Sequence, residues 1–152
     1  MKVFPVILTV TLLINLTTYS QTAEDSVKAA VNNLFTAMKN SDSVLLKSCF
    51  NKNSVLQTII QSKDNVVSVK NESVKDFIRS VSSQFKGSLD ERITFDVIKI
   101  DGPLASVWTP YNFYYRDKFV HCGVNSFQLV KVNNQWKIQY LVDTRRKDGC
   151  EN

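Results

Sequence analysis

His121 is the residue in this sequence whose chemistry is simplest to predict. It is the one histidine among 152 residues, and imidazole is the side chain whose ordinary pKa suits proton transfer near neutral pH. In an enzyme His121 would act as a general acid or base, with Tyr111 or Asp143 as its partner. A single titratable residue seldom makes an active site. A histidine at a strand end or cavity mouth that only hydrogen-bonds a neighbour is therefore the simpler interpretation.

Aromatic and amide side chains on the same part of the chain suggest a ligand-binding surface. Tyr111 and Phe113 alternate along one strand, so they share a face if the strand stays regular across Pro110. Their rings could stack on a flat ligand, or they could form only the core and rim of a sheet. Asn125 and Tyr140 place polar groups on faces that are otherwise apolar. The residues predicted to line a pocket are Tyr111, Phe113, His121, Asn125 and Tyr140.

Two further groups of side chains lie near these residues in the sequence. Asp143, Arg145 and Arg146 follow one another closely at the end of the last strand. They could bind an anionic group at a cavity mouth, or they could form surface ion pairs that contribute little to stability. Cys122 has the opposite strand parity to His121, which argues against a cysteine–histidine nucleophile pair.

The elements that must position these residues are three consecutive antiparallel strands within residues 105–145. Turns are predicted at residues 115–118 and at residues 133–134, because Asn accepts the positive backbone angles of a two-residue hairpin loop. Alternate residues from 119 to 129 share one face of the middle strand. On the last strand the predicted inner face carries Trp136, Ile138, Tyr140 and Val142. If these faces are concave, they form the wall of a cavity.

Helical and strand patterns alternate in the preceding segment. Apolar residues at helical spacing predict a helix that begins after Thr22 or Ser26 and ends near Asn40, then a short helix, and a third helix ended by Gly87. Strands are predicted at residues 54–61, 66–70 and 92–100. This order, with four long strands at the end, predicts an α+β domain whose helices cover one face of a curved antiparallel sheet.

The first 20 residues have the layout of a secretory signal peptide. Lys2 precedes an apolar run from Val3 to Leu16, and small residues stand before a cut ahead of Gln21. The apolar run is too short to span a bilayer comfortably. We expect a secreted or periplasmic protein, with a single domain at residues 21–152 and no stable membrane anchor after cleavage.

Composition narrows the classes of function. The net charge of +5 is scattered, without the basic stripe that nucleic-acid binding requires, so no nucleic-acid partner is expected. No cysteines stand at metal-ligand spacing, so we expect no metal site, and we expect no cofactor. Cys49, Cys122 and Cys150 allow one disulfide and one free thiol, but spacing does not choose the pair. Cys49 is predicted to be a small buried apolar residue rather than a reactive thiol.

Two segments carry a resemblance to a known superfamily. The helix pair LFTAMKNSDSVLLKSCF and the final strands GVNSFQLVKVNNQWKI resemble the nuclear transport factor 2-like superfamily, over residues 24–146. Within it the chain looks most like small exported bacterial proteins of the SnoaL-like or lumazine-binding type. The resemblance implies a cone-shaped antiparallel sheet wrapped around N-terminal helices, a cystatin-like roll. It implies no single function, since the superfamily holds isomerases, dehydratases, cyclases, assembly subunits and binding proteins.

One catalytic feature of the superfamily does not carry over. Its ketosteroid isomerases place a general-base aspartate on the first strand, shortly after the phenylalanine that ends the helix pair. Counted from Phe50, that position falls near Thr58, and no carboxylate lies between Phe50 and Ser62. Because threonine is not a base near neutral pH, isomerase chemistry of that kind is not supported.

Three hypotheses of different classes follow. The first is an exported domain that binds a small apolar or aromatic ligand in an aromatic-lined pocket. The second is a lyase or isomerase, similar to the dehydratases and cyclases, in which His121 transfers protons. The third is a structural module that forms a homodimer, because the exposed face of such a sheet is a ready interface. The lack of a first-strand carboxylate favours the first hypothesis over the second.

Overall fold

The computed structural model describes residues 22–62 and 64–150 of the chain. The predicted signal peptide, residues 1–20, lies outside the described residues. Within them no helix combines the length and apolar character needed to cross a membrane. The elements, in chain order, are α1 (Ala23–Asn40), α2 (Ser43–Cys49), β1 (Phe50–Gln61), β2 (Val67–Glu72), α3 (Val74–Ser82), β3 (Leu89–Ile93), β4 (Val97–Asp101), β5 (Leu104–Tyr115), β6 (Lys118–Val132) and β7 (Gln135–Thr144).

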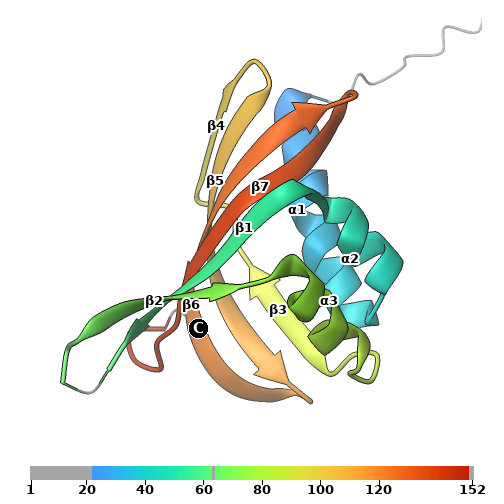
Figure 1. The fold of residues 1–152 in the computed structure, drawn as a ribbon. Helices are drawn as coiled ribbons and strands as arrows, with labels where there is room; N and C mark the ends of the chain where they lie inside the picture. The colour runs from blue at the N-terminus through green and yellow to red at the C-terminus, as the bar shows by residue number, and fades with distance from the viewer. Residues whose placement is uncertain (1–21, 63, 151–152) are drawn as a thin grey trace, which may run out of the picture.

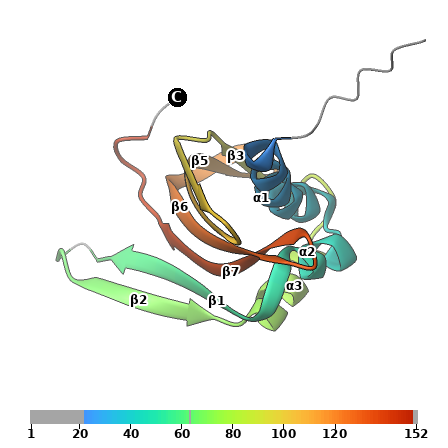
Figure 2. The same cartoon turned by 90° about the horizontal axis from the view of Figure 1, so that it is seen from above.

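The seven strands form one bent sheet, and the three helices gather on one side of it (Figure 1). The strand order is β2-β1-β7-β6-β5-β3, and β4 also pairs with β5. The β1–β2 hairpin extends away from the helices, as the view from above shows (Figure 2). The predicted α+β class and curved sheet are confirmed. The β1–β7 pair is parallel, however, so the sheet is not purely antiparallel as predicted.

The helices begin where the sequence supplies caps. Thr22 accepts a hydrogen bond from the Asp25 backbone N–H, and the Asp25 carboxylate accepts one from the Thr22 backbone N–H, which is a capping box. Asp42 caps α2 by accepting from the Val44 and Leu45 N–H groups, and Ser73 caps α3 by accepting from the Asp76 N–H. The third helix ends at Ser82, earlier than predicted, and Gly87 instead lies in the turn before β3 with a φ of 83°.

The two hairpin turns of the final strands form as predicted. Arg116 and Asp117 have φ values of 50° and 62°, and Asn133 and Asn134 have values of 48° and 61°. Two consecutive left-handed residues match the right-handed twist of the flanking strands. These turns fix the pairing of β5 with β6 and of β6 with β7.

The strand predicted at residues 92–100 is in fact two strands, β3 and β4, and Pro110 explains the break. Both pair with β5, but β3 ends opposite Tyr111 and β4 begins opposite Trp108. Pro110 stands at the gap between them and has no N–H to donate, so a continuous ladder cannot form there. Pro110 still accepts a hydrogen bond from the Thr94 N–H, and β5 keeps its alternation across this position.

A β-bulge in β7 changes which residues face inward. Leu129 pairs with Ile138, but Gln128 already pairs with Tyr140, so β7 contains one extra residue at this point. The inward face therefore passes from Ile138 to Leu141 and Asp143. The predicted continuation of that face through Tyr140 and Val142 is wrong.

The core lies between α1 and the end of the sheet that is nearest the β6–β7 turn. Phe35 on α1 meets Phe127 on β6 edge to face, with ring centroids 6.2 Å apart. The fully buried residues include Val27, Val31, Leu34, Leu46, Phe127, Leu129 and Ile138. Cys122 and Cys150 form a disulfide that holds the C-terminal segment against β6, and Cys49 is free and buried, as predicted for it.

Candidate functional site

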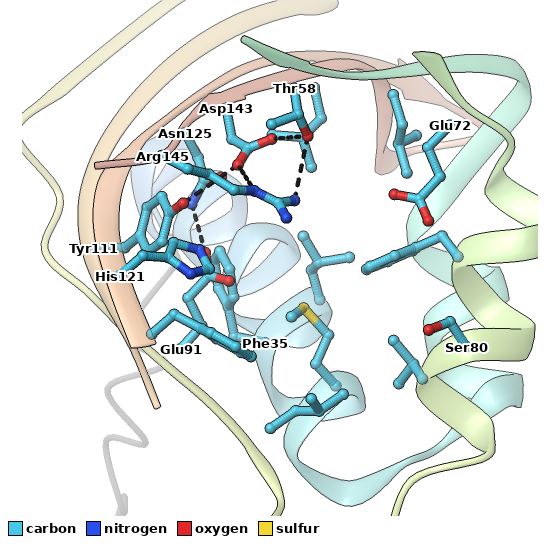
Figure 3. A pocket seen from close by; sticks show the side chains of 18 of the residues that line it. Phe35, Thr58, Glu72, Ser80, Glu91, Tyr111, His121, Asn125, Asp143 and Arg145 are labelled. Carbon is cyan, nitrogen blue, oxygen red and sulfur yellow. Dashed lines mark hydrogen bonds and ion pairs between the residues drawn. The ribbon is translucent and has the colours of Figure 1, made fainter. Parts of the chain in front are cut away.

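A cavity of about 250 Å³ lies where the sheet curves away from α1 and α3 (Figure 3). Its exposed rim includes Glu72, Ser80 and Arg145. The helices supply apolar side chains, and the sheet supplies most of the polar ones. The apolar lining consists of Leu34, Phe35, Met38, Leu56, Phe77, Val81, Leu89, Phe113 and Leu141. A ligand would therefore meet a mainly apolar surface on the helix side and a mixture of apolar and polar groups on the sheet side.

Asp143 is the centre of a hydrogen-bonded cluster at one edge of the cavity. Its Oδ1 accepts from the Thr58 hydroxyl at 2.6 Å, and its Oδ2 accepts from Arg145 Nε at 2.8 Å. The Arg145 guanidinium also donates to Thr58 Oγ1 at 3.2 Å, which closes a three-residue ring of contacts. Because Asp143 and Arg145 pair with each other, their charges largely cancel within the site.

Thr58 is the residue near which the resemblance to the isomerases of the superfamily predicted the position of a general base. In the parallel β1–β7 pair, Thr58 lies opposite Asp143. A carboxylate therefore reaches this part of the cavity from the neighbouring strand. It is held by an ion pair and a hydroxyl, so it does not stand free as a base would.

Glu91, on β3, is a second carboxylate on the cavity wall. Its Oε1 accepts a hydrogen bond from Asn125 Nδ2 at 2.8 Å. Burial raises the pKa of the Glu91 carboxyl to about 7, the hydrogen bond from Asn125 opposes this rise, and the nearby charge of Asp143 adds to it. Glu91 can thus gain or lose a proton near neutral pH.

His121 stands between two aromatic rings on the same wall. The Tyr111 ring meets it edge to face at 5.7 Å, and the Phe113 ring is tilted against it at 5.1 Å. Burial lowers the pKa of His121, and the positive charge of Arg145 lowers it further, although Asp143 opposes them. The imidazole is therefore neutral near pH 7.

Gly123 allows the backbone at Thr144 to lie close to β6 and to Tyr111. The Tyr111 hydroxyl donates to the Thr144 carbonyl at 2.9 Å and lies 3.3 Å from Asp143 Oδ2. A Cβ on residue 123 would stand 1.8 Å from the Thr144 carbonyl oxygen, so only glycine fits. Burial raises the pKa of Tyr111, and the charges of Glu91 and Asp143 raise it further, so its phenol stays protonated.

Four of the five predicted pocket residues lie on the cavity wall: Tyr111, Phe113, His121 and Asn125. Tyr140 does not line the cavity. The bulge in β7 places it opposite Gln128, and its hydroxyl donates to Gln57 Oε1 at 2.6 Å. Asp143 and Arg145, which the sequence left open between an anion site and a surface ion pair, form an ion pair that is at the same time part of the cavity lining.

Glu91 is the residue that sequence reasoning missed. The signal was present, because Leu89, Glu91 and Ile93 alternate and Leu89 and Ile93 pack against the core. A charged residue at the middle of such a face is rare unless it has a partner or a role. In the described part of the chain, histidine, cysteine and acidic residues nowhere gather in threes close enough to hold a metal ion.

Solved structures share this architecture. An NTF2-like protein of unknown function from Shewanella baltica superposes with a TM-score of 0.64 at 16% identity, covering 88% of this chain and 100% of its own. The chain has the nuclear transport factor 2-like fold. A second such protein, from Methylobacillus flagellatus, gives a TM-score of 0.61 at 18% identity, over 81% of this chain and 91% of its own.

A solved structure described as cystatin-like also resembles this chain. A protein of unknown function with a cystatin-like fold from Nostoc punctiforme gives a TM-score of 0.64 at 11% identity, over 86% of this chain and 97% of its own. The sequence matches no family model, and no curated protein matches it. The SnoaL-like or lumazine-binding subtype stays a prediction.

Proposed function

We propose that this chain is an exported domain that binds a small molecule in the cavity between the helices and the sheet. The observation that carries the proposal is a cavity lining that combines apolar side chains, on α1, α3 and the sheet, with a few polar groups around Glu91, His121 and Asn125. Binding sites commonly combine an apolar surface with a few convergent polar groups. A volume of about 250 Å³ suits a ligand smaller than a typical drug.

Export is the second part of the proposal. The signal-like residues 1–20 motivate it, and the Cys122–Cys150 disulfide supports it, because disulfides persist mainly in oxidising compartments. Expression of the full chain in a bacterium, followed by N-terminal sequencing of the material outside the cytoplasm, tests it. A product that begins at Gln21 is expected. Retention of an intact N-terminus in the cytoplasm would contradict export.

A cavity-filling variant tests the binding proposal. Leu141→Trp places an indole in the cavity, whereas Val132→Trp changes an exposed position at the far end of β6 and serves as the control. Both would be compared with the wild type in a thermal-shift screen of small aromatic metabolites. Ligands that raise the Tm of the wild type and of Val132→Trp should not raise that of Leu141→Trp. If the two variants respond alike, the cavity is not the binding site.

A second candidate function is a lyase or isomerase. The observation in its favour is that a neutral imidazole and a carboxyl that titrates near neutral pH face the same cavity. His121 would accept a proton and Glu91 would supply one to the substrate. Once a substrate is identified, His121→Ala and Glu91→Gln should each reduce kcat by about 10²-fold or more. Full turnover by both variants would exclude this candidate.

A third candidate is assembly as a homodimer through the outer face of the sheet. Val97 and Trp108 lie opposite each other on β4 and β5 and are 42% and 44% exposed. Exposed apolar residues that adjoin one another favour an interface. Sedimentation equilibrium should show a dimer for the wild type and a monomer for Trp108→Ser. A wild-type protein that stays monomeric at high concentration would exclude it.

A further inference from the structure

The charges around the cavity do not balance. Its lining contains three carboxylates, Glu72, Glu91 and Asp143, and one guanidinium, Arg145. Arg145 is paired with Asp143, and His121 adds no positive charge near neutral pH because burial lowers its pKa. Two negative charges therefore remain when every carboxylate is ionised. A cavity of this charge disfavours an anionic ligand.

Glu91 is the charge in greatest need of a partner. In residues 22–62 and 64–150, none of the ion pairs involves Glu91. Asn125 supplies one neutral hydrogen bond to Oε1. The Glu91 side chain is part of the cavity lining. A carboxylate in such surroundings is stabilised most by a cation placed against it.

The groups that face Glu91 come from four neighbouring elements. From α1 the lining side chains Leu34, Phe35 and Met38 are uncharged, and Lys39 is occupied by Asp90. Titratable and charged neighbours across the sheet are Tyr111 on β5, His121 on β6, and Asp143 and Arg145 at the end of β7. The positive charge of Arg145 is the one that acts on Glu91, and Asp143 offsets it.

Aromatic rings stand beside this carboxylate. Phe113 pairs with Glu91 across β3 and β5, and Tyr111 and His121 continue the same wall. Figure 3 shows Glu91, His121 and Tyr111 together on one wall, with Glu72 and Ser80 on the facing side. A carboxylate next to aromatic faces suits an ammonium group, which gains from both the ion pair and the ring quadrupoles.

From these observations we infer that the ligand of the cavity is a small organic amine, with its protonated nitrogen against Glu91 and its apolar body against α1 and α3. This inference rests on the proposed binding function and specifies its ligand class. A neutral ligand would leave the Glu91 carboxylate without a charge partner, and an organic acid would add a third uncompensated negative charge.

The inference has a consequence for pH that separates an amine from other ligands. An amine requires ionised Glu91, whose pKa is about 7. Its apparent affinity should therefore rise about tenfold from pH 6 to pH 8, in proportion to the ionised fraction. An alkyl amine stays protonated over this range. A ligand that accepts a hydrogen bond from protonated Glu91 would show the opposite trend.

Three probes that share one aromatic body test the inference: phenethylamine, 2-phenylethanol and phenylacetate. Each would be titrated into the ¹⁵N-labelled protein at pH 6 and pH 8, with Kd taken from the NMR shifts of amides on the cavity wall. We expect phenethylamine to bind most tightly at pH 8. Glu91→Gln, which keeps the acceptor for Asn125, should weaken its binding at pH 8 at least tenfold and remove the pH dependence. Glu24→Gln, an equal charge change on α1 outside the cavity, is the control.

The outcomes are distinct. Tighter binding of the alcohol or the acid at the same amides would overturn the amine inference and leave the binding function standing. A pH dependence that persists in Glu91→Gln would also overturn it and would direct attention to His121. If none of the probes shifts these amides, the amine inference fails. The binding function is then decided separately, by whether Leu141→Trp loses the thermal shifts that Val132→Trp keeps.

Discussion

The β6–β7 pair is solid at one end and hollow at the other. Towards the Asn133–Asn134 turn, Phe127, Leu129 and Ile138 are fully buried against α1. Beyond the bulge in β7, the same two strands present His121, Asn125 and Asp143 to the cavity. The two strands pair on both sides of the bulge, so the two ends differ mainly in what covers them.

The two ends of the β6–β7 ladder therefore differ in what they contribute: one end mainly stabilises the fold, and the other lines the candidate site. The solid end buries apolar surface, which is the main favourable contribution to folding. The hollow end holds polar groups in partly desolvated positions, which costs stability unless each group has a partner. Asp143 has its partners within the chain. Glu91 accepts a hydrogen bond from Asn125 and forms no ion pair within the described residues, and we propose that a ligand supplies its charge partner.

The largest effect is expected from a truncation at the solid end. Phe127→Ala should lower the free energy of unfolding by about 3–5 kcal/mol, because it removes a fully buried ring and leaves a void against Phe35. Phe113→Ala, at the hollow end, should cost less than about 1.5 kcal/mol, because the ring already borders an open cavity. Urea denaturation measures both. Equal costs would contradict the comparison.

Removal of the disulfide should come next in size. The Cys122–Cys150 bond closes a loop with a sequence separation of 28, which predicts a loss of about 3–4 kcal/mol for the double serine variant. Cys49→Ala is the control, since Cys49 is a free buried thiol and forms no bond of this kind. The double variant should also bind cavity ligands more weakly, because the disulfide anchors the segment that follows Arg145. Unchanged binding would show that the cavity rim does not depend on this anchor.

Gly123→Ala should have an intermediate effect confined to the hollow end. The new Cβ would collide with the Thr144 carbonyl and the Tyr111 ring. A loss of about 1–3 kcal/mol is expected from such overpacking. Tyr111→Phe, which removes the hydroxyl that donates to Thr144 but keeps the ring, separates the hydrogen bond from the steric effect. If Gly123→Ala is as stable as the wild type, the Thr144 carbonyl does not lie as close to residue 123 as it does in this structure.

The smallest effect concerns Glu91 and pH. Its pKa rises from 4.5 to about 7 on folding, so the folded chain keeps a proton that the unfolded chain has lost between these values. Stability should therefore fall by roughly 1–2 kcal/mol as the pH rises from about 4.5 to about 7, with allowance for solvent in the cavity. Glu91→Gln should remove this fall and be the more stable protein at pH 8. Thermal denaturation of both proteins across this range measures it, and identical pH profiles would contradict the prediction.

Much of the fold could be predicted because it depends on local features. The caps at Thr22, Asp42 and Ser73 and the left-handed turn residues act within a few positions along the chain. Alternation along β5 and β6 likewise placed Tyr111, Phe113, His121 and Asn125 on one wall. The break between β3 and β4 was not predicted, because it depends on which strand lies opposite Pro110.

The composition of the site could be predicted only in part. Period-two alternation fails at a bulge, and the sequence around Tyr140 gives no sign that β7 contains an extra residue. That one residue moves Tyr140 away from the cavity and brings Leu141, Asp143 and Arg145 to it. Glu91 escaped notice because its importance lies in what surrounds it, namely Asn125 and the charges at the end of β7.

The sequence by itself determined most of the elements, the two hairpin turns of the final strands and the shared wall of Tyr111, Phe113, His121 and Asn125, because these follow from interactions between near neighbours. The tertiary structure decided the parallel pairing of β1 with β7, which sets Thr58 against Asp143, and the joining of Cys122 with Cys150 rather than Cys49. It also decided that a carboxyl on β3 meets an amide on β6 beside a cavity. A pKa or a binding surface depends on groups far apart in the chain, and only the packed structure brings them together.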